Sequence, residues 1–173
     1  MPTRTYEPIA TFTLPGDTTT QTLSGIPNTY TDLIITVSTA EQTGSSNGLR
    51  VYFNGQNTGG TYDVTHGVGR TSTASSQRET SINTYSTAWS AAPGANLGSF
   101  FCQIHIMNYT STSWYKPIIT NIYQSEATQD TELSVGNWRN TAVINSVSFE
   151  TSGGSGNQLK AGTVFTIFGI KAA

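Results

Sequence analysis

The chain has 173 residues, of which 35% are hydrophobic and only 10% are charged, and its net charge at pH 7 is −2. So few charges exclude long charged helices and a strongly acidic or basic binding surface. The eight basic residues lie scattered along the chain, so no basic stripe is available for a nucleic-acid backbone. We therefore expect a nearly neutral protein with no nucleic-acid partner.

Length and hydropathy indicate a single domain that spans residues 1–173. A chain of this length can bury a sizeable core, and no repeat or low-complexity linker divides it. It contains no signal-peptide pattern and no run of 18 apolar residues, so we expect neither secretion nor a membrane partner. Cys102 is the only cysteine, which excludes an internal disulfide and fits synthesis in a reducing cytoplasm.

The N-terminal region predicts a short irregular arm followed by a β-hairpin. The arm covers about residues 1–7, and strands are expected over residues 6–14 and 18–23. Between them lies Pro15-Gly16-Asp17, a turn sequence in which proline fixes φ and glycine tolerates a positive φ. We expect the two strands to pair with each other.

Alternating apolar residues predict most of the remaining strands. In residues 32–40 the side chains of Leu33, Ile35 and Val37 share one face, and residues 49–54 repeat the pattern. Asn54-Gly55 then supplies the positive φ values of a tight turn, in a turn region at 54–60. Further strands are expected over 78–89, 99–108, 114–123, 132–139, 143–151 and 163–171, with a loop at 152–157.

This pattern is typical of an all-β protein, an antiparallel, jelly-roll-like β-sandwich of roughly 8–10 strands. Phe100, Cys102, Ile104 and Ile106 are expected to face the core together. Pro117 has no N–H to donate, so it indicates an edge strand or a bulge within residues 114–123.

No pattern of nucleophile, base or metal ligand stands out. We expect His66 to be a solvated turn residue and His105 to lie on a surface face of its strand. Gly67-Val-Gly69-Arg70 is interpreted as a turn, because a phosphate-binding loop needs a third glycine and a following helix. Asp130 and Glu132 precede a strand but lack the ligand spacing of a calcium loop. We therefore expect no catalytic residue, no metal and no cofactor.

Trp114 and Tyr115 are the strongest candidates for a functional role. They follow a polar loop, and neighbouring residues on a strand point to opposite faces, so at least one of the two is expected to face away from the core. An exposed aromatic residue among polar neighbours is typical of a protein interface and also of a sugar-stacking platform. We favour the interface and keep the sugar platform as the alternative.

Four segments of the chain resemble small β-sandwich structural proteins of tailed bacteriophages, of the type found in phages of cyanobacteria and other marine bacteria. The segments are Ser24-Gly-Ile-Pro-Asn-Thr-Tyr-Thr-Asp-Leu-Ile-Ile35, Leu49-Arg-Val-Tyr-Phe-Asn-Gly55, Leu133-Ser-Val-Gly-Asn-Trp-Arg-Asn-Thr-Ala142 and Gly162-Thr-Val-Phe-Thr-Ile-Phe-Gly-Ile-Lys171. None of them is a catalytic motif. The resemblance therefore implies a jelly-roll-like domain in a virion, and it transfers no active-site residue.

The resemblance leaves the position in the virion open, but similar domains at the ends of long fibre proteins follow a coiled-coil or β-helical shaft, which this sequence lacks. We therefore expect a non-enzymatic capsid decoration or cement protein that binds and stabilises the lattice of the major capsid protein. Its implied location is the capsid surface of the virion, after synthesis in the host bacterial cytoplasm. The implied partners are the major capsid protein and further copies of the chain, with a trimer as the first expectation. Arg4 and Tyr6 in the arm, together with Trp114 and Tyr115, are the predicted partner contacts.

Two other functions stay open at this point. The alternative is a head-fibre or tail-tip domain that binds a host-surface glycan through exposed Tyr and Trp side chains. A third, weaker interpretation is an enzyme such as a capsule depolymerase, which needs two carboxylates or a catalytic triad at one site.

Overall fold

A computed structural model describes residues 5–39, 49–69, 72–87, 100–124, 131–151 and 158–171. Within these ranges the chain forms twelve β-strands and no helix. The strands are β1 (Tyr6–Thr13), β2 (Thr20–Ser24), β3 (Asp32–Ser38), β4 (Leu49–Phe53), β5 (Tyr62–Gly69), β6 (Ala74–Ile82), β7 (Tyr85–Ser86), β8 (Phe100–Ile106), β9 (Lys116–Gln124), β10 (Thr131–Trp138), β11 (Ser146–Thr151) and β12 (Val164–Ile170).

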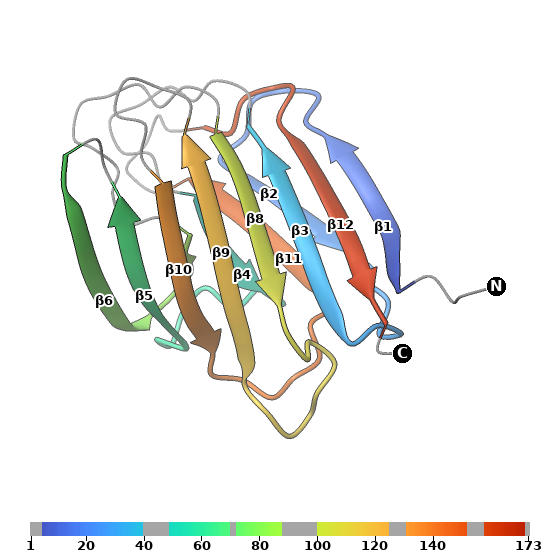
Figure 1. The fold of residues 1–173 in the computed structure, drawn as a ribbon. Helices are drawn as coiled ribbons and strands as arrows, with labels where there is room; N and C mark the ends of the chain where they lie inside the picture. The colour runs from blue at the N-terminus through green and yellow to red at the C-terminus, as the bar shows by residue number, and fades with distance from the viewer. Residues whose placement is uncertain are drawn as a thin grey trace.

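The strands form two antiparallel sheets of unequal width that pack as a β-sandwich (Figure 1). The larger sheet has eight strands in the order β1-β12-β3-β8-β9-β10-β5-β6, and the smaller has four in the order β2-β11-β4-β7. Figure 1 shows the larger sheet in front and the smaller sheet behind it. The predicted antiparallel sandwich is confirmed, with more strands than expected, whereas a jelly-roll order of connections stays a prediction.

Strict alternation of apolar and polar residues builds the core between the sheets. Leu33, Ile35 and Val37 of β3 are completely buried, as are Ile104 and Ile106 of β8, while the residues between them lie on the outer face. Successive side chains of a strand point to opposite faces, so an alternation of period two places every second side chain in the core. The faces predicted for residues 32–40 and 99–108 are confirmed.

Aromatic rings join the two sheets. Phe149 of β11 contacts Phe165 of β12 with ring centroids 4.7 Å apart, and Phe53 of β4 contacts Trp138 of β10 at 5.4 Å. All four residues are completely buried. Burying a large apolar side chain contributes about 1.5–3 kcal/mol relative to leaving it in water, and each of these pairs connects one sheet to the other.

The predicted first hairpin is wrong. β1 pairs with β12 at the edge of the larger sheet, whereas β2 pairs with β11 in the smaller sheet. The turn at Pro15-Gly16-Asp17 thus carries the chain from one sheet to the other. It is held by Asp17, whose carboxylate accepts hydrogen bonds from Lys160 Nζ at 2.6 Å and from the Ala161 N–H at 3.0 Å. Contacts with a segment distant in sequence therefore replace the expected local pairing.

Strand β5 was not expected, because its two glycines and its histidine hide the alternation. Gly67 and Gly69, interpreted as turn residues, both lie within β5, and Arg70 lies outside the described residues. The buried positions of this strand are Tyr62, Val64, His66 and Val68. One face of β5 therefore packs against the core like its neighbours, and β5 joins β10 to the edge strand β6.

Two details of the other strands differ from expectation. The strand expected over residues 78–89 is divided after Ile82, close to Ser81 with its positive φ of 54°, and the short β7 belongs to the smaller sheet. Pro117 lies in an interior strand, since β9 runs between β8 and β10. The ladder between β8 and β9 extends only to Ile118, so the missing N–H of Pro117 falls beyond it.

The tight turn after β4 is confirmed. Asn54 and Gly55 have φ values of 53° and 72°, and the Gln56 N–H donates to the Phe53 carbonyl at 2.9 Å. Two successive positive φ values closed by this hydrogen bond are the signature of a type I′ turn. The Phe53 N–H, in turn, donates to the phenolic oxygen of Tyr62 at 3.0 Å, and this phenol donates to the Gln56 carbonyl at 3.1 Å.

Alkaline pH should destabilise the fold through its buried phenols and thiol. Burial raises the pKa of Tyr62, Tyr85 and Cys102. As the pH rises the unfolded chain loses these protons first, so the free energy of unfolding is undiminished below about pH 9 and falls above it. In urea titrations at neutral pH, we expect Tyr62→Phe to lower the free energy of unfolding by about 1–2 kcal/mol, because the buried Phe53 N–H loses its acceptor. Because the variant lacks one buried phenol, its free energy of unfolding should also fall less steeply at alkaline pH.

The exposed Tyr123 provides the matched control for this change. Tyr123→Phe should alter neither the stability at neutral pH nor the alkaline slope. An alkaline slope that Tyr62→Phe and Tyr123→Phe change equally would contradict the assignment to the buried phenol.

Candidate functional site

The outer face of the larger sheet carries apolar side chains across its middle strands. The register aligns them in one row, in which each residue lies opposite the next on the neighbouring strand: Phe168, Ile34, His105, Ile119 and Val135. Side chains opposite one another on a sheet are in contact range. Four of the five members of this row are apolar, although they point away from the core.

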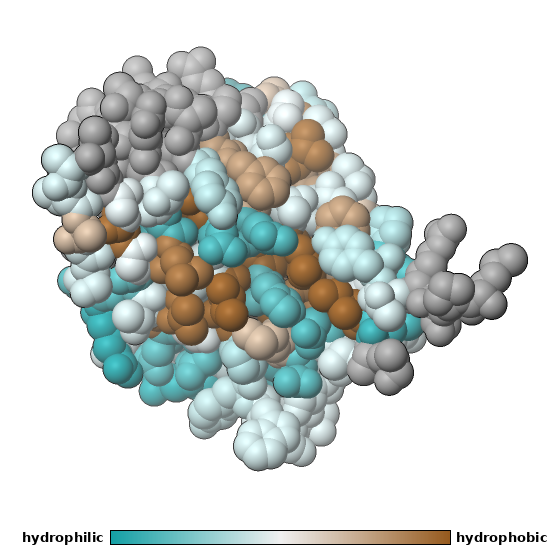
Figure 2. Space-filling view, viewed as in Figure 1, coloured by the Kyte–Doolittle hydropathy of each residue, from teal (hydrophilic) through white to brown (hydrophobic). Residues whose placement is uncertain are grey.

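Larger apolar residues flank this row and are about half exposed. The exposed fractions are 43% for Phe101, 54% for Tyr123 and 50% for Leu133, and Val135 within the row is 48% exposed. Figure 2 shows hydrophobic residues gathered over the middle of this face. We call this surface the outer apolar patch, and it consists of Ile34, Phe101, Ile119, Tyr123, Leu133, Val135 and Phe168. A contiguous apolar surface of this kind marks an interaction site more often than isolated apolar residues do.

Few charges interrupt the patch. Among the described residues of β3, β8, β9 and β10, Asp32 and His105 are the only Asp, Glu, His, Lys or Arg side chains on the outer face. His105 Nε2 lies 3.0 Å from Asp32 Oδ2, and Asp32 Oδ1 accepts a hydrogen bond from the Asn108 N–H at 2.9 Å. The surface position predicted for His105 is confirmed.

Tyr6 extends the patch to the edge of the sheet, whereas Arg4 lies outside the described residues. The Tyr6 ring stacks on Phe168 with centroids 4.8 Å apart and stays 45% exposed. Its partial burial raises the pKa of the phenol. Tyr6 and Glu7 belong to β1, which confirms the strand expected from residue 6, so the arm expected over about residues 1–7 does not include these two positions. They are ordered because β1 pairs there with Ile170 and its neighbour on β12.

Trp114 and Tyr115 lie at a different end of the molecule. They belong to the loop between β8 and β9, which projects beyond the sheets at the bottom of Figure 1, while β1 lies along the lateral edge. Their exposed fractions are 73% and 53%. Both point away from the core, which agrees with the expectation for at least one of them. The structure therefore does not bring Tyr6 together with this pair.

A buried lysine supports the exposed loop. The Lys116 side chain is inaccessible to solvent just beneath the loop surface, and Nζ donates to the carbonyls of Ser111, Trp114 at 3.0 Å and Asn140 at 3.5 Å. Burial lowers the pKa of this ammonium group. Because one charged group binds three carbonyls, the backbone under Trp114 is fixed, and the two aromatic side chains are presented on a preorganised loop.

His66 is at the centre of a buried polar cluster, so its prediction as a solvated turn residue is wrong. The imidazole is completely buried on β5. Nδ1 lies 2.6 Å from Glu132 Oε1 and 2.8 Å from Ser134 Oγ, and Nε2 lies 3.2 Å from Glu79 Oε2. Sequence reasoning missed the cluster because His66 was not placed on a strand. The alternation of Tyr62, His66 and their apolar neighbours was the signal that could have found it.

The cluster has the residue types of a hydrolase triad but not its accessibility. The Ser134 hydroxyl is completely buried and donates to the Thr87 carbonyl at 3.1 Å, so no open position lies beside it for a substrate carbonyl. Glu132 is directed to His66, and Asp130 lies outside the described residues. Within the described part of the chain no group of three His, Cys, Asp or Glu side chains is arranged to hold a metal ion. The geometry indicates a structural role for this cluster.

Comparison with known proteins finds no match, either to a protein-family model or to a curated protein. Among the described residues there is also no helix long and apolar enough to cross a membrane. The case for function therefore depends on the surfaces described above.

The two histidines allow a matched test of the buried cluster. His66→Gln leaves the buried Glu132 with one hydrogen-bond partner fewer, and we expect a loss of about 1–3 kcal/mol in the free energy of unfolding. His105→Gln removes a partly exposed pair with Asp32 and should cost less than about 1 kcal/mol. Both values come from urea or thermal unfolding at neutral pH. Equal losses in the two variants would show that the His66 cluster contributes no more than a surface ion pair.

Proposed function

We propose that the chain is a non-enzymatic structural protein that acts by binding a protein surface, and specifically a capsid decoration protein of a tailed bacteriophage. In this proposal it sits on the outside of the virion, where it binds the lattice of the major capsid protein and stabilises it. The observation that carries the proposal is the outer apolar patch on the larger sheet. The resemblance of four segments to small β-sandwich virion proteins supports the choice of partner.

The dimensions of the larger sheet suit such a contact. Eight strands about 4.8 Å apart, each of seven to nine residues with a rise of about 3.3 Å per residue, give a face of roughly 35 by 25 Å. This is on the order of 800 Å², the area that one partner contributes to a standard protein interface. An interface of this size with an apolar centre does not need ion pairs.

The scarcity of charge on this face suits a repeated lattice. Apolar contacts are little affected by salt, whereas attraction between exposed charges is screened at physiological ionic strength. A partner that repeats many times also multiplies a modest contact when several copies of the chain are joined. We therefore propose self-association as well, with a trimer as the first arrangement to test. A jelly-roll order of connections belongs to the same proposal.

Particles that contain and lack the chain provide the direct test. Gold labelling of intact particles should place many copies over the head, and particles made without the chain should lose resistance to heat or osmotic shock while adsorbing to the host normally. The stability loss is expected because each missing copy removes contacts between capsid subunits. Normal head stability together with lost adsorption would overturn the decoration role.

The exposed loop between β8 and β9 favours a second candidate function. Trp114 and Tyr115 are the most exposed neighbouring aromatic pair among the described residues, and Lys116 holds the backbone beneath them. Aromatic faces on a fixed loop can stack on sugar rings. The second candidate is therefore a head-fibre or tail-tip domain that binds a host-surface glycan.

Two double variants separate these functions. Leu133→Thr with Val135→Thr keeps β-forming residues at two half-exposed positions, so it should keep the melting temperature within a few degrees but reduce co-sedimentation with particles that lack the chain. Trp114→Ala with Tyr115→Ala should leave co-sedimentation unchanged. If only the loop variant fails to bind particles or host cells, the outer apolar patch is not the binding surface.

A further inference from the structure

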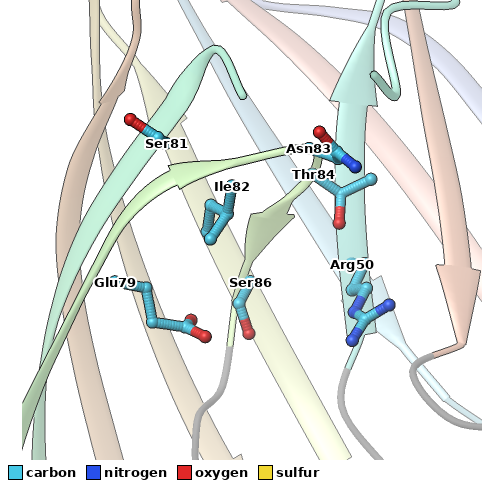
Figure 3. Close-up of a pocket in the computed structure, with 7 residues that line it drawn as sticks. All are labelled: Arg50, Glu79, Ser81, Ile82, Asn83, Thr84 and Ser86. Atoms are coloured by element: carbon cyan, nitrogen blue, oxygen red, sulfur yellow. The ribbon is translucent and has the colours of Figure 1, made fainter. Parts of the chain in front are cut away.

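A polar hollow of about 320 Å³ lies at the lateral edge of the sandwich, on the side of β6. Its lining comes from β6, from the turn that follows, and from the strands β7 and β4 of the smaller sheet. In Figure 3 the side chains of Glu79 and Arg50 lie on opposite sides of Ser86, and those of Asn83 and Thr84 lie above it. The hollow is separate from the outer apolar patch and from the loop that carries Trp114.

The Arg50 guanidinium is available to a ligand. Arg50 is opposite Ser86 in the ladder between β4 and β7 and opposite Glu150 in the ladder between β4 and β11. Within the described part of the chain its side chain nevertheless makes no hydrogen bond and no ion pair. A guanidinium presents several donors in one plane and binds a carboxylate through two parallel hydrogen bonds. The side of the hollow formed by β4 therefore suits an anionic group.

Glu79 gives the opposite side a different character. Its Oε2 is held by His66 Nε2 at 3.2 Å, and His66 is itself fixed by Glu132, whereas Oε1 has no partner among the described residues. With the carboxylate fixed through Oε2, its other oxygen, Oε1, can accept hydrogen bonds from the hydroxyl groups of a ligand. The negative charge of the carboxylate repels a second anion. A ligand must therefore keep its anionic group at Arg50 and turn hydroxyl groups toward Glu79.

We propose that this hollow binds an acidic sugar, a hexuronic acid unit, with its carboxylate on Arg50 and its ring hydroxyls donating to Glu79 Oε1. The Thr84 hydroxyl also lines the hollow and can both donate a hydrogen bond to a ring hydroxyl and accept one from it. The volume is at the lower end of the range for small-molecule sites, as a single sugar unit requires. This site does not depend on the proposed lattice contact, because it uses none of the outer apolar patch.

Calorimetric titration of the purified full chain at neutral pH tests the site, with glucuronate as the ligand and glucose, acetate and inorganic phosphate as comparisons. We expect saturable binding of glucuronate, at least about tenfold tighter than that of the other three, since each of them lacks the carboxylate, the hydroxyls or both. Arg50→Gln should weaken glucuronate binding at least about tenfold. Thr84→Val should weaken it by a smaller factor.

Arg78→Gln is the matched control, because Arg78 is an exposed arginine on β6 whose side chain does not line the hollow. It should leave glucuronate binding unchanged, and circular dichroism should show that all variants keep the fold. The proposal is overturned by an absence of saturable glucuronate binding, by acetate or phosphate binding as tightly as glucuronate, or by equal effects of Arg50→Gln and Arg78→Gln. None of these outcomes bears on attachment to particles, so the two proposals can fail separately.

Discussion

Packing of aromatic rings between the two sheets is the interaction on which the rest of the structure depends. The chain has one cysteine, so no internal disulfide can join the sheets, and the described residues form no helix that could cover a sheet face. Phe149 with Phe165 and Phe53 with Trp138 join the sheets at two places. The Phe53 site is strengthened by Tyr62, whose phenol satisfies the Phe53 N–H. Gly136 lets the backbone of β5 and the Tyr85 ring approach closely, because a Cβ there would lie 2.1 Å from the Asp63 carbonyl oxygen and 2.9 Å from that ring.

The unequal width of the sheets explains where polar side chains can lie inside the sandwich. The larger sheet has four more strands than the smaller, and its last two, β5 and β6, carry His66 and Glu79. A buried polar group is tolerated only when it is hydrogen-bonded. At this end each imidazole nitrogen faces a carboxylate, and the Ser134 hydroxyl reaches a carbonyl. The cluster therefore replaces apolar packing at the side of the sandwich and also orients Glu79 toward the edge hollow.

Apolar residues lie on the outer face of the larger sheet as well as in its core. In β9, Ile118 is completely buried in the core while its neighbour Ile119 faces outward, and in β10 the outward residues Leu133 and Val135 are about half exposed. Strands that are apolar on both faces are typical of sheets covered on both sides. The outer side of this sheet has no covering layer among the described residues (Figure 1). This contrast is the reason that we propose a protein partner for the face.

The sequence by itself determined the local features, namely the strand periods, the core faces of β3, β4 and β8, and the Asn54-Gly55 turn. These features depend on neighbours one to three residues away, so their physics can be read from short segments. Tertiary structure alone decided that β1 and β2 lie in different sheets, that Pro117 lies in an interior strand, and that His66 meets Glu79 and Glu132. Those outcomes depend on pairing between strands distant in the chain, and many pairings satisfy the same alternation. The outer apolar patch and the edge hollow follow from that pairing, which is why no single segment of the sequence indicates either of them.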